Sequence, residues 1–170
     1  MRLEPFGEQH LDALERMLED GDPDLLRFTR IPEPVPPDFA STWLARYEDG
    51  RRDGTREAFA ALGADGELLG LGLVPTLDRD AGEAEIGYIV AAEHRGHGVA
   101  SAILREVTAW AFAQGIERAE LFIDVRNPAS ERVAQRAGYV REGTLRSVHH
   151  KGDLRIDATV WSRLPSDPDP

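Results

Sequence analysis

Apolar residues recur at steps of three and four in three stretches of the chain, which is the pattern of a helix with one buried face. A fourth helix is predicted where Asn127 and Pro128 supply a cap and a first-turn residue and Gly138 supplies a stop. The four predicted helices cover residues 8–20, 39–50, 99–115 and 128–138. The prolines between 32 and 37 predict a surface loop, because proline lacks a backbone donor and fixes φ.

Short apolar segments bounded by Gly, Pro, Asn or Asp predict strands. Apart from a strand at the start of the chain, they lie at 56–62, 67–74, 84–90, 119–125, 139–143 and 154–161. Asp65 and Gly66 predict a hairpin turn between the first two of these, and Pro75 is expected to end the second. The order of elements predicts an α/β (α+β) fold with one sheet and helices on both faces. We expect one domain over residues 1–164 and a disordered tail over 165–170.

Composition narrows the possible functions. The 170 residues are enough for one domain, and 41% of them are hydrophobic. The absence of cysteine excludes disulfides and a thiol nucleophile. A net charge of -11 opposes binding to nucleic acid or to an anionic membrane. The sequence shows neither a long apolar run nor a secretory signal pattern, so a cytoplasmic location is expected.

The histidines do not form a metal-binding pattern. His94 and His97 lie too close to a turn to share an ordinary metal-binding face, and His149 and His150 have no Cys or acidic ligand pattern beside them. We therefore expect no metal. His149 or His150 could instead line an acceptor site on the last hairpin.

The most informative segment runs from Glu85 to Glu106, EIGYIVAAEHRGHGVASAILRE. In it a strand leads through a turn with Gly96 and Gly98 directly into a helix. Backbone N–H groups therefore converge at the positive end of that helix, where a phosphate binds well. Arg95 adds a guanidinium that can contact phosphate with two donors. A plain strand-to-helix turn would explain the glycines equally well.

Two motifs resemble the GCN5-related N-acetyltransferases (GNAT), in particular their RimJ/RimL-like branch. Arg95–Ala100, RGHGVA, matches the signature Q/R-x-x-G-x-G/A, and Asn127–Tyr139, NPASERVAQRAGY, resembles the second acetyl-CoA motif. The EIGY strand and the closing EGTLR…KGDLRID…W segment extend the resemblance to about Leu164. The resemblance implies a GNAT fold: a single mixed, mostly antiparallel sheet of about seven strands with a splayed central strand pair.

The resemblance also implies roles for individual residues, with acetyl-CoA as cosubstrate. Pyrophosphate would be held by the amides of six consecutive residues, Arg95, Gly96, His97, Gly98, Val99 and Ala100. Pantetheine would enter between the diverging strands 87–90 and 121–125 and bond to the backbone at Ile89 and Val90. The Val90 amide would polarise the thioester carbonyl. Asn127 would bond to the pantetheine arm, and Ser130 would protonate the departing thiolate.

An attacking amine must be neutral, so a base is needed. Glu85 is the best candidate, because its strand leads into the glycine loop and a Glu at the equivalent place is the base in histone-acetylating relatives. Glu83, on the same strand face, or water is the alternative. Many members of the family carry a tyrosine acid seven residues after the Asn, but here that position is Ala134. Tyr139 is interpreted as a core residue.

The resulting hypothesis is acetyl transfer to a primary amine, on a protein N-terminus or a small molecule, by direct attack in a ternary complex of a monomer or homodimer. A catalytically inactive acyl-CoA-binding module is one alternative. A dinucleotide-binding oxidoreductase fits less well, because Ser101 stands where G-x-G-x-x-G requires its third glycine.

Overall fold

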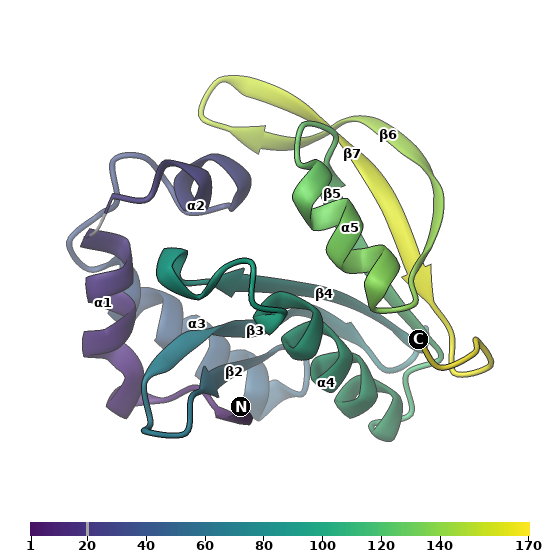
Figure 1. Ribbon diagram of the computed structural model, residues 1–170, viewed down its shortest axis with the longest axis horizontal. Helices are drawn as coiled ribbons and strands as arrows, with labels where there is room; N and C mark the ends of the chain where they lie inside the picture. The colour runs from purple at the N-terminus through teal and green to yellow at the C-terminus, as the bar shows by residue number, and fades with distance from the viewer. Residues whose placement is uncertain (20) are drawn as a thin grey trace.

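The computed structural model describes residues 1–19 and 21–170 and contains one sheet of seven strands in the order β1-β2-β3-β4-β5-β7-β6 (Figure 1). Neighbouring strands are antiparallel except β4 and β5, which are parallel. The strands are β1 Arg2–Pro5, β2 Glu57–Leu62, β3 Leu68–Asp78, β4 Glu83–Val90, β5 Arg118–Asp124, β6 Val140–Lys151 and β7 Leu154–Arg163. The predicted mixed, mostly antiparallel sheet is confirmed.

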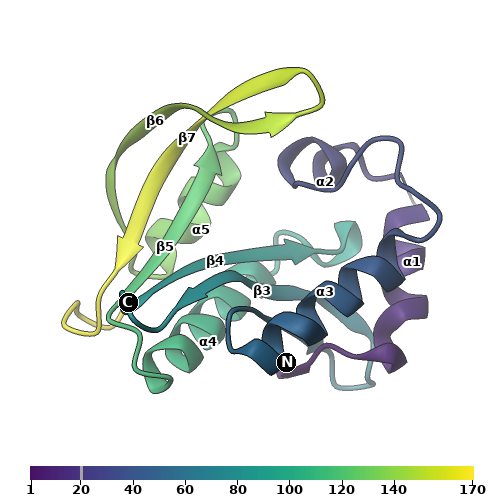
Figure 2. The ribbon, with the colours of Figure 1, turned by 180° about the vertical axis from the view of Figure 1, so that it is seen from behind.

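Helices cover both faces of this sheet, as Figures 1 and 2 show from opposite sides. Besides two short 3-10 helices, η1 Glu8–His10 and η2 Ala92–His94, the helices are α1 Leu11–Glu19, α2 Pro23–Phe28, α3 Phe39–Asp53, α4 Val99–Ala113 and α5 Pro128–Arg136. Along β2, Phe59 and Ala61 face the core with α4 and α5, whereas Ala58 and Ala60 face the core with α1 and α3. This alternation is what a strand between two helical layers requires.

One helix and two element boundaries differ from the sequence-based prediction. Helix α2 was not predicted, because six residues are too few for a period; Asp22 caps it by accepting from the Asp24 N–H at 3.0 Å. Helix α3 continues past Gly50 and ends at Gly54, whose φ is +72°. Strand β3 continues past Pro75, since its register with β4 shifts between Leu73 and Thr76 and no ladder donor is needed there.

Two further outcomes concern the ends of elements. The first predicted helix is present as η1 and α1, and its expected last residue, Asp20, lies outside the described residues. Strand β6 is much longer than the predicted 139–143, and with β7 it forms a long hairpin. No helix among residues 1–19 and 21–170 has the length and apolar character needed to cross a membrane.

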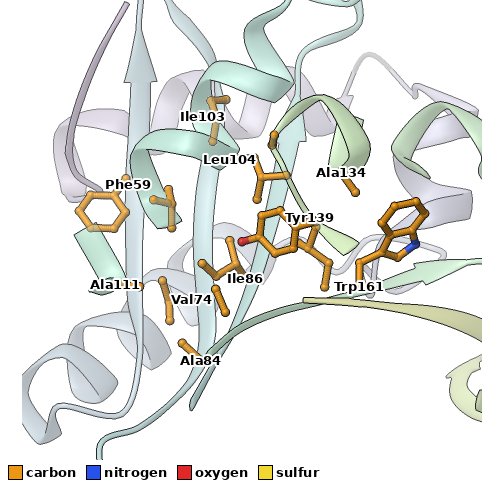
Figure 3. Packing of buried hydrophobic residues seen from close by; sticks show 14 of the residues in the cluster. Phe59, Val74, Ala84, Ile86, Ile103, Leu104, Ala111, Ala134, Tyr139 and Trp161 are labelled. Atoms are coloured by element: carbon orange, nitrogen blue, oxygen red, sulfur yellow. The ribbon is translucent and has the colours of Figure 1, made fainter. Parts of the chain in front are cut away.

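Helix α4 packs directly against the β3 backbone because β3 has glycine beneath it. A Cβ on Gly72 would lie 2.5 Å from Val107 Cγ2, closer than real Cβ atoms come to a neighbour, and 3.0 Å from Ile103 Cγ2, which is a tight contact. Ile103, Leu104 and Val107 are fully buried there, and Figure 3 shows Ile103 and Leu104 in the same core as Ile86 and Tyr139. This packing fixes where α4 begins relative to the end of β4.

Candidate active site

Strands β4 and β5 are joined at one end and diverge at the other. They pair at Glu83↔Arg118, Ala84↔Ala119 and Glu85↔Glu120, and in the described chain no pair joins them beyond that point. Both strands nevertheless continue, β4 to Val90 and β5 to Asp124, and Figures 1 and 2 show them separating. The splayed pair that the sequence resemblance implied is therefore present. We call the space between the unpaired halves the β4–β5 gap.

Along the end of β4, the peptide groups of successive residues face β3 and the gap in turn. The Ala91 N–H donates to the Leu69 carbonyl at 3.0 Å, so the peptide groups of Ala91 face β3, and those of Ile89, two residues earlier on the same strand, face it too. Strand alternation then turns the peptide groups of Tyr88 and Val90 toward β5. Of the two predicted backbone contacts, Val90 thus has the orientation that its role requires, whereas the peptide groups of Ile89 face β3.

The loop between β4 and α4 has the shape that the sequence predicted. Gly96 and Gly98 have φ of +79° and +83°, in the left-handed region that disfavours other residues. A Cβ built on either would meet no heavy atom within 4 Å among the described residues, so the loop presents its backbone to open space. Gly98 precedes the first turn of the 15-residue helix α4 and has no side chain to cap it. The amides of Val99 and Ala100 therefore stand at an uncapped helix N-terminus.

Arg95 holds this loop in place. Its Nε donates to the Val90 carbonyl at 3.1 Å, and its guanidinium pairs with Asp22, the residue that caps α2. The Arg95 side chain as a whole is 36% exposed. His97, two residues after Arg95 in the same loop, is exposed.

Helix α5 brings two of the predicted site residues to the mouth of the gap. Asn127 caps the helix, with its Oδ1 accepting from the Ser130 N–H at 3.0 Å. The Ser130 Oγ lies 2.7 Å from the hydroxyl of Tyr88 on β4. Burial raises the pKa of Tyr88 to about 12, so this phenol stays protonated near neutral pH. Tyr88 was missed in the sequence, since nothing in a pattern pairs residues 42 positions apart.

Glu85 lies on the opposite face of the sheet. Its neighbours Ala84 and Ile86 point into the core with α4, so strand alternation turns Glu85 toward the face that carries α3. The side chain is 20% exposed, and its Oε1 accepts from Arg30 Nη2 at 2.8 Å. Burial raises the pKa of Glu85 and Arg30 lowers it, and the effect of burial is the larger. A carboxylate with a raised pKa is a stronger base than an ordinary one.

Glu85 stands at the last β4–β5 pair, at the edge of the gap, whereas the alternative Glu83 stands at the paired end and is exposed.

On the Glu85 face, the His149 ring lies edge-on to Phe122, with centroids 6.0 Å apart. The tip of the β6–β7 hairpin reaches across to the segment after α2, where Lys151 Nζ donates to the carbonyls of Thr29 and Ile31. Figures 1 and 2 both show the hairpin and α2 on the same side of β4.

Two other residues singled out in the sequence are structural. Tyr139 is buried, and its hydroxyl lies 2.6 Å from Thr108 Oγ1 inside the core of Figure 3, which confirms the interpretation of Tyr139 as a core residue. Ala134 is buried in the same core. Within the part of the chain that the structure describes, no three His, Asp or Glu side chains gather so that they could hold a metal ion.

The family follows from a comparison with known proteins. Residues 1–140 match the family model described as an acetyltransferase (GNAT) domain. The chain belongs to the GNAT acetyltransferase family. It is 32% identical over 142 residues to the Bacillus subtilis (strain 168) protein named "Putative ribosomal N-acetyltransferase YdaF", an alignment covering 83% of this chain and 70% of that protein. This GNAT membership makes the chain an acyltransferase and decides against the dinucleotide-binding alternative.

Solved structures show the same GNAT fold. The ribosomal L7/L12 alpha-N-protein acetyltransferase RimL, in complex with coenzyme A, superposes with a TM-score of 0.87 at 21% identity, covering 95% of this chain and 92% of that one. A Vibrio cholerae spermidine N-acetyltransferase in complex with CoA and spermine gives a TM-score of 0.83 at 20% identity, covering 98% and 96%. At this identity the two structures show the fold, and the RimJ/RimL-like branch is supported by the family match and the ribosomal N-acetyltransferase relative.

Proposed function

We propose that this GNAT enzyme transfers the acetyl group of acetyl-CoA to a primary amine, on a protein N-terminus or a small molecule, by direct attack in a ternary complex. The observation that carries the proposal is the β4–β5 gap, with the glycine loop at its mouth, Ser130 on one side and Glu85 on the other. The names of the relatives, which include a ribosomal-protein and a spermidine acetyltransferase, support an amine acceptor.

The donor side fits a diphosphate and an extended arm. The amides of residues 95–100 would hold the pyrophosphate, because a loop with Gly96 and Gly98 lets phosphate approach the backbone at the positive end of α4. The Val90 N–H would donate to the thioester carbonyl, whose oxygen gains charge as the amine attacks. Asn127 would contact the pantetheine arm at the start of α5.

The two faces of the sheet supply the two proton transfers. On one face, Glu85 takes the proton that the acceptor ammonium loses, which frees the nitrogen lone pair to form the new bond to the carbonyl carbon. On the other face, Ser130 donates a proton to the sulfur as the carbon–sulfur bond breaks, and the Tyr88 hydroxyl positions and resupplies Ser130. The nitrogen loses its second proton as the amide forms, and that proton replaces the one that Ser130 and Tyr88 gave up, so the products are an amide, a thiol and protonated Glu85.

Direct attack is favoured over a covalent acyl-enzyme for two reasons. The chain has no cysteine, and the Ser130 hydroxyl lies against a phenol with a high pKa rather than against a base that could activate it. The donor and acceptor groups also lie on opposite faces, so both substrates can be bound at once.

The test combines binding with turnover. Isothermal titration should show micromolar binding of coenzyme A and no binding of NADH. Thiol release should then be measured from acetyl-CoA with free-N-terminus peptides, spermidine and aminoglycosides, using N-acetylated peptides as the matched control. Release with at least one free amine and none with blocked peptides supports the proposal. Coenzyme A binding without turnover on any amine would favour the inactive binding module instead.

A further inference from the structure

The group proposed as the base is paired with a cation of the chain itself. Arg30 Nη2 donates to Glu85 Oε1 at 2.8 Å, although the two residues are 55 positions apart in the sequence. The two partners differ in exposure, since the side chain of Arg30 is 59% exposed and that of Glu85 is 20% exposed. A guanidinium that reaches from solvent to a mostly buried carboxylate stands where an incoming ammonium must approach.

The backbone around Arg30 is fixed, whereas its side chain is not. Lys151 on the β6–β7 hairpin donates to the carbonyls of Thr29 and Ile31 on either side, and the Ile31 side chain is buried. The guanidinium itself has one carboxylate partner in the described chain and is mostly in water, where an ion pair is weak. Arg30 can therefore swing away from Glu85 without moving the loop that carries it.

Among the described residues Glu85 has one cationic partner, Arg30, because the neighbouring Glu120 is paired with Arg118. Glu120 on β5 stands beside Glu85 and disfavours its ionised form, while Arg30 favours that form. The hydroxyl of Tyr47 on α3 and the ring of His149 on β6 also lie close enough to feel the charges of this pair. A second cation beside Arg30 would be repelled by it, so the guanidinium and an acceptor ammonium compete for the same carboxylate.

We propose that Arg30 occupies the ammonium subsite on Glu85 in the free enzyme and leaves it when a cationic primary amine binds, which makes Arg30 a specificity-determining residue for the acceptor. This inference rests on the proposed function, in which Glu85 takes the proton of the acceptor. It predicts that the enzyme binds its acceptor less tightly than the bare carboxylate would, because binding must displace a resident cation.

The variant Arg30→Gln tests this with spermidine and a free-N-terminus peptide as acceptors. We expect the KM for either acceptor to fall several-fold, with the affinity for coenzyme A unchanged. Because Arg30 holds the pKa of Glu85 down against the effects of burial and Glu120, its removal should also move the acidic limb of the kcat/KM profile to higher pH. Arg30→Lys, which keeps a shorter cation, should give a KM between those of the wild type and Arg30→Gln.

Arg27→Gln is the matched control, since it removes one guanidinium from the adjacent helix α2 without touching Glu85. An equal fall in KM in this control would overturn the inference, and so would an unchanged or higher KM in Arg30→Gln. Glu85→Gln separates the two proposals. Wild-type turnover in Glu85→Gln would show that Glu85 is not the base and would overturn the proposed mechanism. Loss of turnover there, with no KM effect from Arg30→Gln, would overturn the role of Arg30 alone.

Discussion

The two faces of the sheet at the β4–β5 gap are built differently. The face under α4 and α5 rests on a continuous buried core, and the groups that it offers are backbone amides and the hydroxyls of Ser130 and Tyr88. The opposite face offers charged side chains from separate segments, with Glu85 paired to Arg30 and Lys151 linking the hairpin to the loop after α2. Donor binding should therefore depend on backbone geometry, and acceptor binding on side chains that can be exchanged.

The largest effect expected is on the acceptor face. Glu85→Gln removes the base but keeps its shape, so kcat should fall by roughly 10²–10⁴-fold while the affinity for acetyl-CoA stays unchanged. Glu83→Gln, at the exposed and paired end of the same strand, is the control and should keep wild-type kcat. Steady-state kinetics with a titration of coenzyme A measures both. An equal loss of kcat in the two variants would show that the effect comes from removing a negative charge from β4 and not from removing the base.

The pH dependence of wild-type activity tests the role of Glu85 as the base without a mutation. Glu85 must be ionised to accept a proton, and burial raises its pKa above that of an ordinary glutamate. Activity should therefore be lost as the pH falls through that raised pKa, and this limb should be absent in Glu85→Gln. A limb in the usual glutamate range would show that Glu85 does not control it.

On the donor face, Gly98→Ala should weaken coenzyme A binding by roughly tenfold, because forcing a residue with a Cβ into the left-handed region costs about 1–2 kcal/mol and the loop would relax away from its binding shape. Gly115→Ala is a close control at the other end of α4. Its φ is +86° against +83° for Gly98, and neither Cβ would meet an atom of the described chain within 4 Å. Both variants should lose similar stability in thermal unfolding, but Gly115→Ala should bind coenzyme A normally.

The two hydroxyls should act as one unit. Ser130→Ala and Tyr88→Phe should each lower kcat by about tenfold, which is below the roughly 10²–10⁴-fold that general acid catalysis typically contributes. The double variant should lose no more than Ser130→Ala alone, because Tyr88 acts through Ser130. Additive losses in this double-mutant cycle would show that Tyr88 acts independently, and a large fall in Tm would mark a packing effect.

The smallest effect expected is at the link between the hairpin and the loop. Lys151→Met removes hydrogen bonds to the carbonyls of Thr29 and Ile31, typically about 0.5–1.5 kcal/mol each. Acceptor KM should rise by about threefold, while coenzyme A binding on the other face should not change. A change in coenzyme A affinity would contradict the division between the two faces.

The sequence-based prediction is right where a local signal determines the structure. Asn127 and Pro128 open α5 as their residue types predict, and Gly98 precedes α4 with the positive φ that only glycine adopts easily. Pro75 was misjudged because the rule that proline ends a strand fails at a bulge, where its missing N–H is not needed. A six-residue helix such as α2 leaves no period to detect.

The contacts that complete the candidate site are long-range, and no local pattern encodes them. Tyr88 meets Ser130 only because β4 and α5 border the same gap, and Arg30 meets Glu85 only because the segment after α2 is held over the sheet. The sequence named Glu85 and Ser130 as candidate site residues, and the structure places Glu85 at the last β4–β5 pair and Ser130 beside Tyr88. Their partners could be found only from the folded arrangement.

Lys151 is the single lysine of the sequence, and it stands at the contact between the hairpin and the loop over the acceptor face. Amine-reactive dyes will therefore attach at one internal position beside the terminal amine. Burial lowers the pKa of Lys151, which increases the neutral and reactive fraction of its amine. Coupling a fluorophore there would displace the amine from the carbonyls of Thr29 and Ile31, so the labelled enzyme should show the same rise in acceptor KM as Lys151→Met.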